Sequence, residues 1–370
     1  MSTLKLSRMG LTDGIILIVF LSISRFFLIT STEAIKLSAG LAWYLYLIST
    51  LVTLIIGLAL INILKNFEGD LLAMTERLLG KSWFYIIGIY YALLFLSNCT
   101  VLTRKFSENI AQVGFRDIDI IVVIFLYVLI MSISTYFGIE VLARGAYLLI
   151  PFIIFLTAFI LVLIIPLFNV HNLAPWQGTG IGNVTLYGMA SAGANSGVII
   201  IAILAPSFQD FITKAKSVFY GSIIGGLYKM TCITTILLAI GVERSKEMLI
   251  PFYELASLAY FDKSFQRFED LTVFLWIFVG LISIGVSAWV TLYLVARMLK
   301  LSDIKPLIPL LSIIVFSTAT FAENALSIID FDLGFLKIYH GLSMYVFPII
   351  LLFMFYKQKL KLLFKKNSAV

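Results

Sequence analysis

Long apolar stretches alternate with short polar connections along the whole chain. Ten of these stretches approach the roughly 20 residues that a helix needs to cross a ~30 Å hydrocarbon core. They cover residues 11–30, 41–64, 83–103, 118–137, 146–168, 184–205, 217–241, 271–296, 306–322 and 335–356. The pattern predicts an all-α integral membrane protein, with ten transmembrane helices in a single domain over residues 1–370.

The composition agrees with a membrane protein and argues against a soluble one. Of the 370 residues, 61% are hydrophobic and 13% are charged, and the mean hydropathy is +1.04. So few charges cannot cover that much apolar surface in water. The first stretch is too long for the core of a signal peptide and no small-residue cleavage site follows it, so we expect it to remain as a spanning helix.

The basic residues predict an orientation in the membrane and not a nucleic-acid partner. With the N-terminus inside, the inner connections hold more Lys and Arg than the outer ones, which places both termini in the cytoplasm. Much of the net charge of +7 lies in the tail 357–370, and such a cluster beside a span is typical of an anchor to anionic lipid in the bilayer. The tail lysines are Lys357, Lys359, Lys361, Lys365 and Lys366.

Two connections are longer than the rest. In this orientation residues 167–183 and 242–270 both face outward. The second connection is amphipathic and is interrupted by Pro251, so we expect it to form one or two short helices over the outer mouth.

Ten spans divide into two sets of five, an arrangement used by transporters with inverted repeats and broken first helices. The first repeat would cover about 11–168 and the second about 184–356. Polar or small residues interrupt the first span of each repeat, at 22–26 and at 190–197. The alternative is that small residues only allow helices to approach closely, which we favour for Gly221 and Gly225.

Two basic residues lie inside predicted spans. Arg25 would cost roughly 2.5–3.5 kcal/mol in mid-span, so it should bind a carboxylate of a ligand or another span, with Glu33 as one structural candidate. Alternatively, its side chain extends to the outer interface. Lys229 could occupy the place of a coupling cation, remain neutral, or form a structural ion pair. From the interruptions and the facing span we select as ligand-binding candidates Ser22, Ser24, Arg25, Phe26, Ala194, Asn195, Ser196, Gly197, Ser283 and Ser287.

The sequence gives no indication of an enzyme, a metal site or a cofactor. It contains no nucleophile–base pair, no phosphate-binding lysine motif and no paired carboxylates within the apolar stretches. His171 and His340 are far apart and have no Cys or acidic residue at ligand spacing. We expect Cys99 and Cys232 to be small buried hydrophobic residues.

Four short motifs, in order along the chain, carry a resemblance to a known family. They are Gly138-Ile-Glu-Val-Leu-Ala-Arg144 before span 5, Asn172-Leu-Ala-Pro-Trp-Gln-Gly-Thr-Gly-Ile181, Leu204-Ala-Pro206, and Phe265-Gln-Arg-Phe-Glu269 followed by Trp276. With these motifs the chain resembles the B subunits of bacterial spore germinant receptors (GerAB type), ten-span members of the amino acid–polyamine–organocation superfamily. Each motif is weak alone, but their order and the number of spans make the resemblance specific.

The resemblance implies a LeuT-like fold with broken helices 1 and 6. It also implies a multi-pass protein of the inner membrane of the spore that works with A and C receptor subunits. Such a subunit binds a small germinant, typically an amino acid, in a transporter-like pocket and triggers germination. An amino-acid permease of the same superfamily and, more weakly, a membrane scaffold are the alternatives.

The sequence departs from the family pattern near the expected pocket. Ser24-Arg25 stands where the family often has an uncharged break containing glycine, and Gly197 is followed by Val198 and not by an acidic residue. These differences bear on the identity of the ligand more than on the assignment of the chain to this family.

Overall fold

The structure is a computed structural model that describes residues 8–114, 118–259, 269–321 and 325–367. Apart from one isolated β-bridge between Met9 and Phe208, the regular structure of these residues is helical. The α-helices are α1 Leu11–Arg25, α2 Ser31–Ser38, α3 Ala42–Leu64, α4 Leu71–Leu79, α5 Lys81–Asn109, α6 Ile120–Phe137, α7 Ile139–Ile164, α8 Ile181–Ser191, α9 Gly197–Ile203, α10 Phe211–Ile240, α11 Val242–Glu247, α12 Pro251–Ser257, α13 Glu269–Leu299, α14 Ile308–Phe321, α15 Ala325–Phe331 and α16 Lys337–Asn367.

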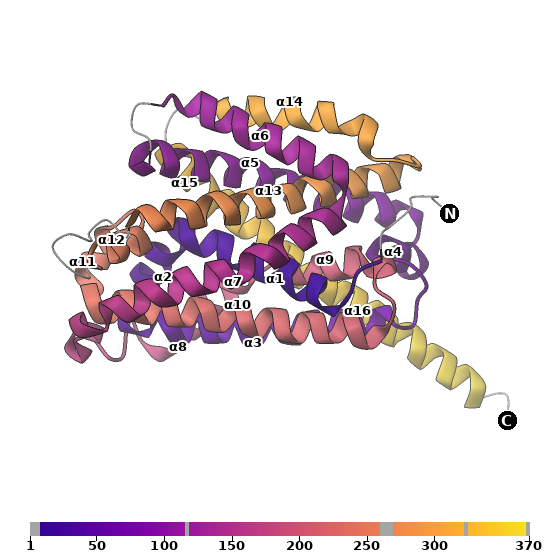
Figure 1. The fold of residues 1–370 in the computed structure, drawn as a ribbon. Helices are drawn as coiled ribbons and strands as arrows, with labels where there is room; N and C mark the ends of the chain where they lie inside the picture. The colour runs from indigo at the N-terminus through magenta and orange to yellow at the C-terminus, as the bar shows by residue number, and fades with distance from the viewer. Residues whose placement is uncertain (1–7, 115–117, 260–268, 322–324, 368–370) are drawn as a thin grey trace.

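The long helices run roughly side by side, with α1 and α13 in the interior of the bundle (Figure 1). The most apolar part of α13 is 78% buried and that of α1 is 72% buried, whereas that of α7 is only 28% buried. Helices α6 and α7 expose large apolar side chains, as expected where lipid and not water covers a surface. α4 and the C-terminal part of α16 lie at one end of the bundle, and α2, α11 and α12 lie at the other (Figure 1).

The number of spans is bounded by helix length and composition. Among the described residues, eight helices are long and apolar enough to cross a membrane, or nine if the bent pair Ile181–Ala194 and Gly197–Ile203 counts as one span. The expected stretch 306–322 corresponds to a shorter apolar helix, Lys305–Phe321. The count of ten and the five-plus-five repeat therefore stay predictions.

The first span is interrupted, but at a different place from the one predicted. Ser22 and Ser24 lie in regular α-helix, and the interruption is the π-helical turn η1, Phe26–Thr30, in which Leu28 has non-helical angles of φ −94° and ψ −150°. Side-chain hydroxyls donate hydrogen bonds to backbone carbonyls near this turn. Tyr46 donates to the Thr30 carbonyl at 3.3 Å, and Ser31 donates to the Leu28 carbonyl at 3.3 Å. The break therefore leaves its polar groups satisfied within the protein.

A second interruption lies at the predicted place in the stretch 184–205. The 3-10 turn η6, Ala192–Ala194, is followed by a bend of 42° before α9. Glycine is required there by close packing, since a Cβ atom on Gly193 would lie 2.8 Å from the Gly341 backbone nitrogen. A Cβ atom on Gly197 would lie 3.1 Å from Ile18 Cα, so α9 also packs tightly on α1.

A third interruption was not predicted. The π-helical turn η9, Asp332–Leu336, joins α15 to α16, so this span begins well before residue 335. The predicted boundary of span 3 is also wrong, because α5 continues to Asn109 and buries Arg104 and Lys105, which lie beyond the predicted end at residue 103. In both places the helix extends past charged residues because partners inside the protein neutralise them.

The two long connections pack against the ends of the helices. Thr179 in the first donates to the Leu37 carbonyl at 2.6 Å, and Asn172 donates to the Leu238 carbonyl at 2.8 Å. The second forms the two short helices α11 and α12, as predicted. Most of the Phe265–Glu269 motif lies outside the described residues.

Candidate functional site

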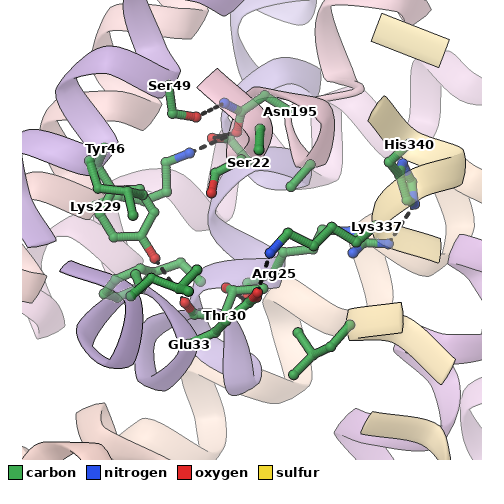
Figure 2. Close-up of a pocket in the computed structure, with 18 of the residues that line it drawn as sticks. Ser22, Arg25, Thr30, Glu33, Tyr46, Ser49, Asn195, Lys229, Lys337 and His340 are labelled. Atoms are coloured by element: carbon green, nitrogen blue, oxygen red, sulfur yellow. Dashed lines mark hydrogen bonds and ion pairs between the residues drawn. The ribbon is translucent and has the colours of Figure 1, made fainter. Parts of the chain in front are cut away.

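The interruptions of the three spans meet around a cavity of about 60 Å³, whose wall combines apolar surface with several polar and charged side chains (Figure 2). A cavity of this volume has room for only a few water molecules, so it suits a small ligand. Its walls come from α1 and η1, α2, α3, the end of α8 with η6, α10, and η9 with α16. The polar and charged lining residues are Ser22, Arg25, Thr30, Glu33, Tyr46, Ser49, Ser191, Asn195, Lys229, Asp332, Lys337 and His340.

The structure brings about half of the predicted site residues to this cavity. Those that line it are Ser22, Arg25, Phe26, Ala194, Asn195 and Lys229. The other predicted residues, which do not line it, are Ser24, Ser196, Gly197, Ser283 and Ser287. Ser24 and Ser283 instead donate to backbone carbonyls, those of Leu21 at 3.1 Å and Phe20 at 3.2 Å.

A buried network that we call the Arg25 cluster consists of Arg25, Asn98, Lys105, Asp332 and His340, of which Arg25, Asp332 and His340 line the cavity. The Arg25 guanidinium donates to Asp332 at 3.0 Å and to the Asn98 side-chain oxygen at 3.2 and 2.9 Å. Its Nη2 also lies 2.7 Å from His340 Nε2. Lys105 Nζ binds the second oxygen of Asp332 at 2.6 Å.

This network decides between the interpretations of Arg25. Its side chain is only 9% exposed and binds a carboxylate of another span, so the prediction of a side chain that extends to the interface is wrong. Glu33 is not its partner either, because Glu33 pairs with Lys337. Behind the cluster, Asn98 donates to Ser287 at 2.8 Å, which gives this predicted residue a supporting position.

A second polar group, which we call the Lys229 group, consists of Lys229, Asn195, Ser49, Thr53 and Tyr46. Asn195 donates to the hydroxyls of Ser49 and Thr53, at 3.0 Å in each case. These two bonds turn its side-chain oxygen toward Lys229, whose ammonium donates to it at 2.8 Å. The ammonium also lies 5.4 Å from the centroid of the Tyr46 ring, a cation–π arrangement (Figure 2).

The charges of the two groups differ in how they are matched. Asp332 lies between Arg25 and Lys105, and Glu33 pairs with Lys337. Lys229 has no carboxylate within ion-pair distance among the residues that the structure describes. The alternative of a structural ion pair at Lys229 therefore finds no partner among the described residues.

Sequence reasoning missed several residues of the site. Asp332 was overlooked because the apolar window for the last span began at residue 335, and His340 was considered only as a metal ligand. Tyr46 and Ser49 lie in an apolar stretch, where a single tyrosine or serine carries no distinctive signal. Asp332 could have been found by asking which acid balances Arg25, since a mid-span cation normally has a partner.

Comparison with known proteins identifies both a family and a fold. The family model described as spore germination protein matches residues 9–326. A search of curated protein sequences finds no significant match.

Among solved structures, Mhp1, a nucleobase-cation-symport-1 family transporter, is similar with a TM-score of 0.64 and 12% identity, over 93% of this chain and 79% of Mhp1. A manganese transporter of Eremococcus coleocola has a TM-score of 0.61 and 14% identity, over 93% and 78% of the two chains. MhsT in complex with L-phenylalanine has a TM-score of 0.59 and 14% identity, over 95% and 99%. At these identities the similarity establishes a LeuT-like transporter fold and not a substrate.

Proposed function

Because this chain belongs to the spore germination protein family, we propose that it is the B subunit of a bacterial spore germinant receptor. In this proposal it binds a small germinant, an amino acid, in the cavity between the helix breaks and thereby triggers germination. The observation that carries the proposal is the family match over residues 9–326, together with a cavity with charged and polar lining residues at the broken helices of a transporter fold.

The chemistry of the cavity suits a small ligand with an anionic group. Lys229 faces it from α10 and offers an ammonium group, while Glu33 lines it from α2 and is already paired with Lys337. The hydroxyls of Ser22 and Ser49 add uncharged hydrogen-bonding groups. Phe26 packs edge-on against Tyr46, with ring centroids 5.8 Å apart, and provides an apolar wall for a small side chain.

The rest of the proposal concerns location and partners. We place the protein in the inner membrane of the spore, with both termini in the cytoplasm, next to the A and C subunits of the receptor. Support comes from the family match and from the several apolar helices of the described chain. The proposal assigns no enzymatic reaction to this chain, in line with its family and with the transporters that share its fold.

Deletion of this chain from its spore-forming host tests the function. Spores that lack it should lose their response to one amino-acid germinant and keep their response to germinants that act through other receptors. Expression of the chain in trans should restore the lost response. An unchanged response to every amino acid tested would contradict the proposal.

A permease of the same fold is the second candidate, and the transporter-like neighbours favour it. Uptake of radiolabelled amino acids into proteoliposomes that contain the purified chain separates the two. Accumulation inside the vesicles at rates typical of a transporter would favour the permease. Binding without accumulation is the result expected for a receptor.

A further inference from the structure

Lys229 is a buried lysine that faces the cavity and has no carboxylate within ion-pair distance among the residues that the structure describes. It is 4% exposed, and within the described part of the chain its polar contacts are one neutral amide oxygen and the face of the Tyr46 ring. An ammonium group has three N–H donors, so at least one remains for another acceptor. A buried charge without a counter-charge is costly, which makes this position a candidate site for an anion.

The surroundings of Lys229 hold it in place but do not neutralise it. Ser49 and Thr53 fix the orientation of the Asn195 amide, which in turn fixes the ammonium. A second void of about 10 Å³, also lined by Lys229, has room for about one water molecule beside the unpartnered hydroxyl of Ser222. A water molecule there would add a hydrogen bond but no negative charge.

The other cations of the cavity differ from Lys229 in their partners. Arg25 and Lys105 share the one carboxylate of Asp332, which leaves one positive charge in excess there, and Lys337 binds Glu33. An anion that bound at Arg25 would have to displace a protein carboxylate, amide or imidazole, whereas Lys229, in the described part of the chain, holds no carboxylate that it would have to displace.

From this difference we infer that Lys229 binds the carboxylate of the germinant and that the carboxylate is the group by which the cavity recognises its ligand. The inference rests on the proposed function, because it names the ligand class of the same cavity. It assigns to Lys229, and not to Arg25, the direct contact with the ligand. The ligand is then an amino acid with a free carboxylate, and its carboxamide should bind poorly.

The test uses the full chain, purified in detergent, and thermal stabilisation by the proteinogenic L-amino acids. The best amino acid is then compared with its carboxamide and with sodium chloride at the same ionic strength. We expect the amino acid to stabilise the protein and its carboxamide to bind at least about 30-fold more weakly, since loss of one partner of a buried charge pair typically costs that much or more.

Variants of Lys229 provide a second, independent test. Lys229→Met should weaken binding of the amino acid by at least about 30-fold, whereas Lys216→Met, at an exposed position on the same helix, should leave it unchanged. The comparison between the acid and the carboxamide uses the unmodified protein, so it stands even if Lys229→Met fails to fold.

The outcomes separate this inference from the proposed function. Equal binding of acid and carboxamide, or full affinity in folded Lys229→Met, would overturn the role of Lys229 and leave the receptor function in place. Equal stabilisation by chloride and by the amino acid would show that the site takes any anion, and would overturn the carboxylate assignment. If no amino acid binds the unmodified protein, the proposed function itself is contradicted.

Discussion

The Arg25 cluster and the Lys229 group lie on the same cavity, yet within the described chain the cations of the first bind a protein carboxylate and the cation of the second does not. Asp332 is held by two cations, and Arg25 reaches three different side chains. Lys229, by contrast, has only one hydrogen-bond acceptor among the described residues. A buried charge with a complete set of partners stabilises a particular packing of helices, whereas one with an incomplete set is available to a ligand.

The comparison also assigns different spans to the two tasks. The Arg25 cluster connects α1, α5, η9 and α16, so it holds the interrupted last span against the first. The Lys229 group connects α10, α3 and the break after η6. We therefore expect substitutions in the Arg25 cluster to change mainly stability and substitutions in the Lys229 group to change mainly ligand binding.

The largest effect should come from Asp332→Asn. This change leaves Arg25 and Lys105 buried without a counter-charge, and breaking a buried pair in this way typically costs about 3–5 kcal/mol. Thermal unfolding of the purified chain and its amount in membranes would measure the loss. Glu76→Gln is the matched control, because Glu76 is exposed on α4.

A double variant sharpens this prediction. In the Asp332→Asn background, Lys105→Met removes one of the two unmatched cations and should recover part of the lost stability. The effects of substitutions at residues in direct contact on the free energy of unfolding are not additive. A stability of Asp332→Asn within about 1 kcal/mol of the unmodified protein would show that the cluster does not depend on its acid.

The next largest effect should follow changes at Arg25. Three different nitrogens of the guanidinium bind Asn98, Asp332 and His340, and a lysine has only one nitrogen, which cannot occupy all of these positions at once. Arg25→Lys should cost about 1–3 kcal/mol of stability, and Arg25→Gln should cost more because it removes the charge as well. Both variants should weaken the germinant response, mainly through lower abundance.

Arg144→Lys serves as the control for Arg25. Arg144 forms an exposed pair with Glu140 one helical turn away, and its side chain is 74% exposed, so this variant should behave as the unmodified protein. Full abundance and a full germinant response in Arg25→Lys would indicate that only charge and reach matter at residue 25, contrary to the observed network.

A change in ligand binding without a large change in stability is expected from Asn195→Asp. The new carboxylate would lie about as close to Lys229 as the present amide oxygen, at 2.8 Å, and would supply the charge that we assign to the ligand. Binding of the best amino acid should weaken at least tenfold, roughly 1.4 kcal/mol. The measurement is a ligand titration, with Asn183→Asp on α8 as the control; an unchanged affinity would contradict the role of Lys229.

Much of the fold could be predicted from the sequence because lipid-facing helices must be apolar over a fixed length. The prediction failed at the ends of spans 3 and 10, where the helices continue through Lys105 and Asp332. A prediction from hydropathy ends a span where a charged residue occurs. In the protein the helices continue through Lys105 and Asp332, because these two residues, far apart in the sequence, form an ion pair.

The candidate site shows the same limit. Arg25, Asn195 and Lys229 could be recognised because a polar residue within a span is energetically costly and normally faces a partner or a cavity. Their partners could not, since Arg25 and Asp332 are 307 positions apart and only the packing of the spans brings them together. The interruption of the first span was placed too early because Ser22 and Ser24, although polar, are compatible with a regular helix when their hydroxyls face the protein interior.

The smallest effect should come from Glu33→Gln, because the Glu33–Lys337 pair lies where the cavity wall is more accessible to water. The two side chains are 21% and 34% exposed, compared with 4% for Asp332. Water screens such a pair, so its loss should cost at most about 1 kcal/mol of stability, and Lys337→Gln should cost a similar amount. Thermal unfolding at low and high salt checks the cause, since the difference from the unmodified protein should shrink as salt rises. A loss as large as that of Asp332→Asn, unaffected by salt, would mean that burial does not distinguish the two pairs and that the contrast between the buried Arg25 cluster and the more exposed cavity wall is wrong.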